Sequence, residues 1–284
     1  MSDSAAMRRR LRVELKRLRG QARLTQREVA KALDWSPSKV IRIESGQVGI
    51  SVTDLRALAA LYHVENGPAL DDLAELARGS KRQPFSDYRD VLPLETIRFF
   101  GYESSASLIR HVQPLLVPGL LQTEEYTRAL LQTYGNEAKE IERIIESRRE
   151  RQEALDRDDP PQVFSILDEA VIRRRVGGGA VMTRQLEHLL ALAERPTITI
   201  QVIPFNVGSY RAMRGPFVHL EFPLSDDPDV VFLDNAREGE RFVDDPEITG
   251  RYQEEFIELE DLAAPPSQLA EYVSSAKKGF RERA

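Results

Sequence analysis

Residues 24–46, LTQREVAKALDWSPSKVIRIESG, hold the signals for two short helices and the turn between them. Thr25 can cap the first helix with its hydroxyl, while Glu28 reaches back to the Thr25 backbone in a capping box. Ser36 is a second N-cap, and Pro37 follows at the first helical position, where the missing N–H of proline costs nothing. The stretch therefore predicts two consecutive helices with separate starts.

The apolar residues of the two expected helices fit a helix-turn-helix. Val29 and Ala30 on the first helix would face Val40 and Ile43 on the second, and the small alanine permits a close approach. Gly46 follows as a typical left-handed stop. Because the second helix of a helix-turn-helix lies in the major groove of DNA, the spacing favours a DNA-binding unit.

At this point the sequence resembles the Cro/repressor-like, xenobiotic-response-element family of helix-turn-helix proteins. The matching segments are LTQREVAKAL (residues 24–33), WSPSKVIRIESG (35–46) and DLRALAALYHV (54–64). Asp34 stands where the family often has glycine, which affects the turn. The resemblance implies an all-α head of five helices over residues 1–80, with further helices near residues 7–19, 52–62 and 67–78.

The resemblance also implies roles for individual residues. Gln26 would touch a phosphate or a base, and Ser36 would contact a phosphate through its hydroxyl or the helix N-terminus. Arg42 has the geometry to read guanine O6 and N7, and Ser38 could bond to a base edge. The candidate DNA-binding residues are Gln26, Trp35, Ser36, Pro37, Ser38, Lys39 and Arg42.

Several of these candidates have a purely structural alternative. Ser36 caps a helix whether or not it touches DNA, and Trp35 is either a plug of the turn or a ring facing DNA. Lys39 is either a phosphate contact or a solvated charge. The family pattern further implies an ion pair between Arg19, at the end of the first helix, and Glu44, at the end of the recognition helix.

The charge of the chain is divided between its two parts. Residues 1–83 hold 16 Lys and Arg against 10 Asp and Glu, a balance of +6, whereas the remainder holds 24 against 36, a balance of −12. A basic head gains from the attraction of phosphates, and an acidic body does not. The division therefore suggests a nucleic-acid-binding head on a body with another task.

Composition excludes several classes of protein. The chain has 41% hydrophobic and 30% charged residues, as soluble globular proteins do. No stretch is apolar enough for a membrane span, and the basic N-terminus lacks the apolar region of a signal peptide, so a cytoplasmic protein is expected. Without cysteine, and with four scattered histidines, no disulfide, metal site or cofactor is expected.

Beyond a linker at residues 81–90, residues 91–284 interleave expected strands and helices irregularly, which predicts an α+β domain. PLLVPGLL (residues 114–121) is either core or part of a dimer surface. The strands are expected at 104–112, 163–167, 198–204, 217–222 and 230–233, and the helices at 124–134, 137–155, 169–176, 183–193, 246–262 and 266–278.

Signs of catalysis are weak in this domain. Gly177–Gly179 lacks the lysine of a phosphate-binding loop and is expected to be a connector. Asp168 and Glu169 end a strand, where catalytic carboxylates often lie, but they equally well cap the next helix. No serine stands in the GxSxG setting of a hydrolase. The chain is therefore not expected to be an enzyme.

Residues 85–284 resemble the large domain of actinobacterial WhiJ-like regulators. The motifs are LVPGLLQTEEYTRALL (116–131), LDEAVIRRRVGGGAVMTRQLEHLLALA (167–193), ITIQVIPF (198–205), GPFVHLEFP (215–223) and DPDVVFLDN (227–235). The resemblance implies an antitoxin-like transcriptional regulator that is encoded beside a small acidic partner protein.

Together these observations predict a homodimeric regulator that binds double-stranded DNA at a palindromic operator, with its C-terminal domain controlled by a small partner protein or ligand. The alternative is an antitoxin-like module that sequesters the partner and autoregulates its operon. Dimerisation is expected because one recognition helix reads too few base pairs for genomic specificity.

Overall fold

The structure is a computed structural model, which describes residues 4–80, 84–223, 228–235 and 239–281. The chain packs as two compact units. The helical unit comprises Met1–Asp87 and Ile97–Ser105, and the sheet unit comprises Tyr88–Thr96 and Ala106–Ala284.

The first five helices of the helical unit enclose one hydrophobic core. Leu11 and Leu15 of the first helix share this core with Leu55 and Leu58 of the fourth, and all four side chains are buried. Removal of such apolar surface from water is the main driving force for the packing. The helices are α1 (Ser4–Gln21), α2 (Gln26–Ala32), α3 (Pro37–Glu44), α4 (Val52–Leu61) and α5 (Pro68–Gly79).

The expected linker is described only in part, because residues 81–83 lie outside the described residues. A 3-10 helix, η1 (Ser86–Tyr88), follows them. Phe85 is buried, and its ring meets the ring of Phe100 edge-on at 5.4 Å between centroids. The second half of the expected linker is therefore folded chain.

The next element, α6 (Leu94–Ser105), corrects the sequence analysis. The sequence predicts an extended segment over residues 104–112, but Ser105 is the last residue of α6 and the first strand begins only at Leu108. Most of α6 from Ile97 onward is buried, including Ile97 and Phe100. A helix buried on several sides has no polar stripe, so its periodicity is weak.

Six strands form one mixed sheet in the order β3-β2-β1-β4-β5-β6. β1, β2 and β3 run parallel, whereas β4, β5 and β6 join by antiparallel pairing. The sheet confirms the α+β class, although β6 was not expected. The strands are β1 (Leu108–Gln113), β2 (Gln162–Asp168), β3 (Ile198–Ile203), β4 (Phe217–Glu221), β5 (Val230–Asn235) and β6 (Gly239–Val243).

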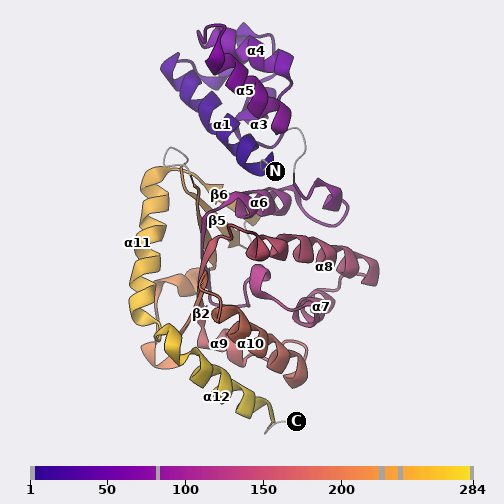
Figure 1. Cartoon of the computed structure of the whole chain (residues 1–284), viewed down its shortest axis with the longest axis vertical. Coiled ribbons are helices and arrows are strands. Elements are labelled where there is room, and N and C mark those ends of the chain that lie inside the picture. Colours follow the sequence, from indigo (N-terminus) through magenta and orange to yellow (C-terminus); the bar gives the residue numbers. More distant parts are fainter. Residues whose placement is uncertain (1–3, 81–83, 224–227, 236–238, 282–284) are drawn as a thin grey trace. The chain divides into compact units, whose positions relative to one another are not determined.

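Helices lie on both sides of this sheet (Figure 1). On one side Phe256 and Leu259 of α11 share a core with Ile203 and Phe217 of the strands. α8 and α10 lie on the other side. The helices are α7 (Glu124–Thr133), α8 (Ala138–Gln152), α9 (Glu169–Arg173), α10 (Gly179–Ala193), α11 (Pro246–Leu262) and α12 (Leu269–Arg281), and the 3-10 helices are η2 (Gly119–Leu121), η3 (Glu153–Asp156), η4 (Phe205–Val207), η5 (Arg211–Arg214) and η6 (Pro266–Gln268).

The apolar run at residues 114–121 is mostly core of the sheet unit. Val117, Leu120 and Leu121 are almost fully buried, and only Leu115 is strongly exposed. The buried Gln185 holds the end of the run, since its Nε2 donates a hydrogen bond to the Leu121 carbonyl at 2.8 Å. Apart from Leu115, the run is not available as a dimer surface.

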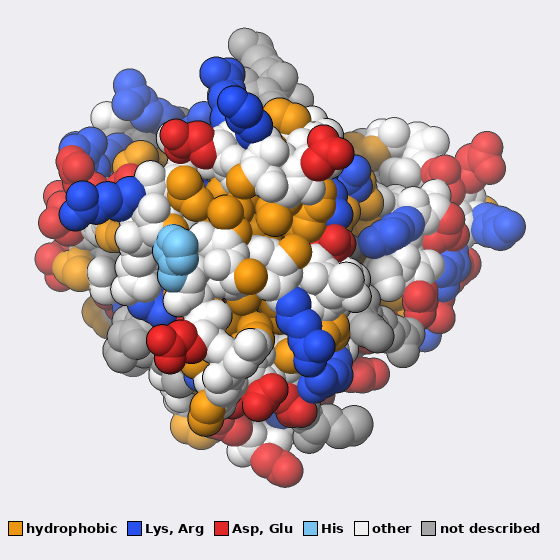
Figure 2. Space-filling model, turned by 90° about the horizontal axis from the view of Figure 1, so that it is seen from above, with side chains coloured by type: hydrophobic (Ala, Val, Ile, Leu, Met, Phe, Trp, Pro, Cys, Tyr) orange, Lys and Arg blue, Asp and Glu red, His pale blue; other side chains and the backbone are white. Residues whose placement is uncertain are grey.

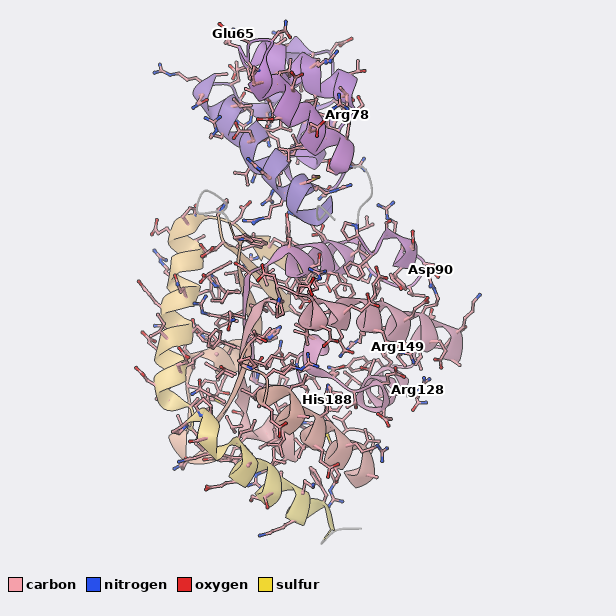
Figure 3. The ribbon with its side chains drawn as sticks, in the orientation of Figure 1. Glu65, Arg78, Asp90, Arg128, Arg149 and His188 are labelled. Carbon is pink, nitrogen blue, oxygen red and sulfur yellow. The ribbon has the colours of Figure 1, made fainter. Side chains whose placement is uncertain are left out.

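The exposed charges are mixed in sign. Figure 2 shows the molecule from above, relative to Figure 1. Hydrophobic side chains gather in the middle of this face, and both acidic and basic side chains lie around them. In the sheet unit, Arg128 of α7 pairs with Glu142 of α8, and Arg149 of α8 pairs with Glu124 of α7 (Figure 3). None of the helices in the described residues is long and apolar enough to cross a membrane.

Candidate nucleic-acid interface

Both helices of the motif begin where the sequence predicts. Thr25 Oγ1 accepts a hydrogen bond from the Glu28 N–H at 3.2 Å, and Glu28 Oε2 accepts one from the Thr25 N–H at 2.7 Å. The bond from the Thr25 backbone favours the charged carboxylate and lowers the pKa of Glu28. Ser36 Oγ accepts from the Lys39 N–H at 3.2 Å, directly before Pro37. These caps fix the two helix starts.

The inner corner between the helices contains the predicted residues. Val29, Ala30, Val40 and Ile43 are all buried, at 5% exposure or less. Because Val40 and Ile43 face the core and Glu44 is also buried, the opposite side of α3, with Ser38, Ile41 and Arg42, faces outward. The corner thereby decides which side of α3 is free to meet DNA.

The turn between the helices passes through Asp34 in the left-handed region, with φ +54°. Trp35 then returns to the motif, and its N–H donates a hydrogen bond to the Ala30 carbonyl at 2.8 Å. The Trp35 side chain is half-buried and packs against the core of the helical unit. Asp34 therefore takes a conformation that glycine adopts more readily than other residues.

The structure brings Arg19 and Glu44 together. Arg19 Nε lies 2.7 Å from Glu44 Oε1, and the hydrogen bond to Glu44 raises the pKa of Arg19. Arg19 Nη1 also donates to the Leu24 carbonyl at 2.8 Å. Since Glu44 is buried and Arg19 is partly exposed, the pair ties the end of α1 to the end of α3.

Gln26 belongs to the same cluster, which the sequence analysis did not foresee. Its Nε2 donates a hydrogen bond to Glu44 Oε2 at 2.8 Å. An amide nitrogen carries two hydrogens, so one remains for a phosphate or a base. The buried carboxylate thus accepts from both Arg19 and Gln26 and sets the orientation of each.

The outer side of α3 carries exposed residues. Ser36, Pro37, Ser38, Ile41 and Arg42 are all exposed. Within the described residues, no acidic group pairs with the guanidinium of Arg42, so all its donors remain available. Ile41 was not among the predicted site residues. Its exposure on the outer side of α3 makes it a candidate, and the sequence alone did not show that exposure.

Lys39 is engaged within the helical unit. Its Nζ lies 3.1 Å from Asp54 Oδ1 and 3.7 Å from the centre of the Trp35 ring. Both contacts hold the ammonium group in place through ion pairing and cation–π attraction. Lys39 of α3, Trp35 of the turn and Asp54 of α4 therefore form one structural group.

The carboxylates at the end of β2 serve the fold. Asp168 Oδ1 accepts from the Ala170 N–H at 2.7 Å, and Asp168 Oδ2 accepts from the Tyr210 hydroxyl at 2.6 Å. Glu169 Oε1 accepts from Arg173 Nε at 2.6 Å, and Glu169 Oε2 accepts from the Phe205 N–H at 2.8 Å. All four carboxylate oxygens are thus satisfied by the protein.

One group in the described residues has the composition of a metal site. His219, Glu221 and Asp229 bring potential ligand atoms within 4.8 Å of one another. However, Arg110 forms an ion pair with Glu221, and its Nη1 lies 3.3 Å from His219 Nδ1. The guanidinium already balances the charge of Glu221, one of the two carboxylates of this cluster. The sequence did not show it, because only His219 and Glu221 share a strand, β4, whereas Asp229 lies in the segment before β5 and Arg110 lies on β1.

Comparison with known families gives two matches. Residues 96–274, more than half of the chain, match the model described as "Domain of unknown function (DUF5753)". The chain belongs to this family. Residues 10–78 match a helix-turn-helix domain. No curated protein and no solved structure matches the chain.

The two matches agree with the division into units except at residues 97–105, which pack with the helical unit but belong to the DUF5753 match. The helix-turn-helix match covers α2 and α3 with their core, and the DUF5753 match extends from α6 into α12. The helix-turn-helix domain supports a DNA-binding regulator. The family description assigns no activity to the C-terminal domain.

Proposed function

We propose that the protein is a sequence-specific transcription regulator whose helix α3 reads the major groove. The observation that carries the proposal is the exposed and unpaired Arg42 on a helix whose inner side is held by Arg19 and Glu44. A guanidinium on a helix held in this way can bond to guanine O6 and N7 together. A helix held less firmly would bind with less sequence specificity, because its side chains would not stay aligned with particular base pairs.

The remaining site residues position the helix on DNA. The free hydrogen of the Gln26 amide and the N-terminus of α3 at Ser36 offer donors to phosphates. Ser38 and Pro37 lie exposed at the start of α3, where base edges are reached. Lys39 could contact a phosphate only after breaking its ion pair with Asp54. Its contribution to DNA affinity is therefore smaller than that of an unpaired lysine.

Two copies are needed for genomic specificity. One α3 helix reads only a few base pairs, and proteins with this motif pair over half-sites about 10 base pairs apart. We therefore propose a homodimer on a palindromic operator. Light scattering on the full chain at micromolar concentration tests the dimer, and a monomer would contradict it.

The C-terminal domain is proposed to receive a signal. The resemblance to the xenobiotic-response-element and WhiJ-like regulators supports this role. In the proposal, a small acidic partner protein or a ligand binds the C-terminal domain and controls DNA binding by the helical unit. The protein is proposed to act in the cytoplasm. The alternative is the antitoxin-like role, in which sequestration of the partner comes first. A binding role is favoured over catalysis because Asp168 and Glu169 are fully used within the fold.

Selection from a pool of random DNA duplexes tests the proposed function. The full chain should enrich an inverted repeat whose half-site centres lie about one helical turn apart. Enrichment of a single half-site would contradict the dimer. Recovery of unselected sequences would contradict sequence-specific binding.

A further inference from the structure

Ile41 stands out on the surface of the helical unit. It is 47% exposed, and it is the one strongly exposed large hydrophobic side chain that the described residues of this unit contain. It lies on α3 between Ser38 and Arg42 in sequence, and Ser38, Ile41, Arg42 and Ser45 follow one another at helical spacing on one side of the helix. An apolar group therefore sits in the middle of the reading surface.

The fold does not require isoleucine at this position. Val40 and Ile43 supply the buried contacts of α3, and both are at most 5% exposed. Ile41 projects away from the core. A polar residue there would leave the core unchanged and would expose no apolar side chain to water. Its branched Cβ also restricts χ1 in a helix, so its methyl groups are held in a nearly fixed place.

The neighbours of Ile41 define the chemistry it would meet. Ser38 and Arg42 offer polar groups that match hydrogen-bonding base edges. The apolar feature of the major groove is the C5 methyl group of thymine. We propose that Ile41 contacts a thymine methyl in each half-site, close to the base that Arg42 reads. This inference rests on the proposed function of α3.

Base substitution in DNA tests the contact directly. Deoxyuridine pairs as thymidine does but lacks the C5 methyl, so each thymine of the selected site is replaced in turn. At one thymine per half-site, the full wild-type chain should bind about fourfold more weakly, the factor expected for burial of one methyl-sized group. The other thymines serve as internal controls.

Variants of the protein complete the test. Ile41→Ala should lose affinity for the thymine site and become insensitive to the same deoxyuridine. Ile257→Ala, at an exposed isoleucine of α11, should keep the wild-type sensitivity. Because Ile41 is exposed, thermal unfolding of Ile41→Ala should match that of the wild type, which excludes misfolding.

Three results would overturn the inference. Wild-type binding that is unaffected by deoxyuridine at every position would leave the proposed function intact but remove the methyl contact. Sensitivity that persists in Ile41→Ala would assign the contact to another residue. Absence of any selected DNA site would overturn the proposed function itself, and this inference with it.

Discussion

At the scale of single residues, Glu44 joins α3 to the end of α1 and the start of α2. Its two carboxylate oxygens accept from Arg19 and Gln26 at 2.7 and 2.8 Å. Removing a buried carboxylate leaves both donors without a partner. The position of α3 therefore depends on a residue that need not touch DNA in the proposed complex.

Replacement of the pair measures this dependence. Glu44→Ala should lower the free energy of unfolding by about 2–4 kcal/mol, because Arg19 loses its counter-charge. The double variant Arg19→Ala with Glu44→Ala should lose less than the sum of the single variants. Urea denaturation of the four proteins checks this, and strict additivity would show that the contact contributes nothing.

Glu240 gives a prediction for pH. Burial raises the pKa of Glu240, and Asp234 and Glu95 add to the rise, while the hydrogen bond from Thr96 opposes it. The folded state then holds this proton more tightly than the unfolded state does. Its ionisation therefore removes stability as pH rises from the ordinary pKa of 4.5 to the raised pKa of the folded protein.

Replacement of Glu240 with glutamine should remove this loss. Glu240→Gln should melt at a higher temperature than the wild type at pH 7, and the difference should shrink below pH 4.5. Glu254→Gln, at an exposed residue of α11, changes the net charge equally and is the control. An equal shift in both variants would assign the effect to net charge.

The sequence predicts the local features of the site better than its contacts. The caps at Thr25 and Ser36 were predictable because their signals lie within three residues. The bond between Gln26 and Glu44 and the pairing of Lys39 with Asp54 join different helices. A single sequence does not encode such contacts in any local pattern.

At the scale of elements, local periodicity explains most successes and failures. α11 spans Pro246–Leu262 as expected, because Asp245 caps it and Pro246 occupies its first turn. β6 was missed, since GERFV is a short, charged edge strand without a hydrophobic alternation. α10 begins at Gly179, four residues before its expected start.

The glycines before α10 have a specific role. Gly177 has φ +69°, and a Cβ placed there would lie 2.6 Å from the Ala129 Cβ of α7. Gly177→Ala should therefore destabilise the protein by about 1–3 kcal/mol, through both backbone strain and overlap. Gly135→Ala is the control, since Gly135 has φ +83° after the end of α7 with open space around it.

Thermal or urea unfolding separates the two causes. The smaller loss expected for Gly135→Ala measures strain alone, and the excess for Gly177→Ala measures the overlap with Ala129 of α7 and with Val181. Equal losses would show that α7 moves away at no cost.

At the scale of the whole molecule, the chain joins a helix-turn-helix unit to a family domain with a mixed sheet. The charge balances of +6 and −12 fit this division, since only the first part gains from phosphate attraction. The sheet order could not be predicted, because strand pairing depends on contacts between distant residues. The α+β class was predictable from irregular alternation alone.

The central claim is that Arg42 reads a base while the other charges of the helical unit bind DNA of any sequence. The direct measurement is the affinity of the full chain for its selected site and for random DNA. Arg42→Ala should cost about 1–3 kcal/mol on the selected site and much less on random DNA. Arg78→Ala, at an exposed arginine of α5 (Figure 3), should leave the ratio of the two affinities unchanged. Equal losses on selected and random DNA for Arg42→Ala would contradict the account.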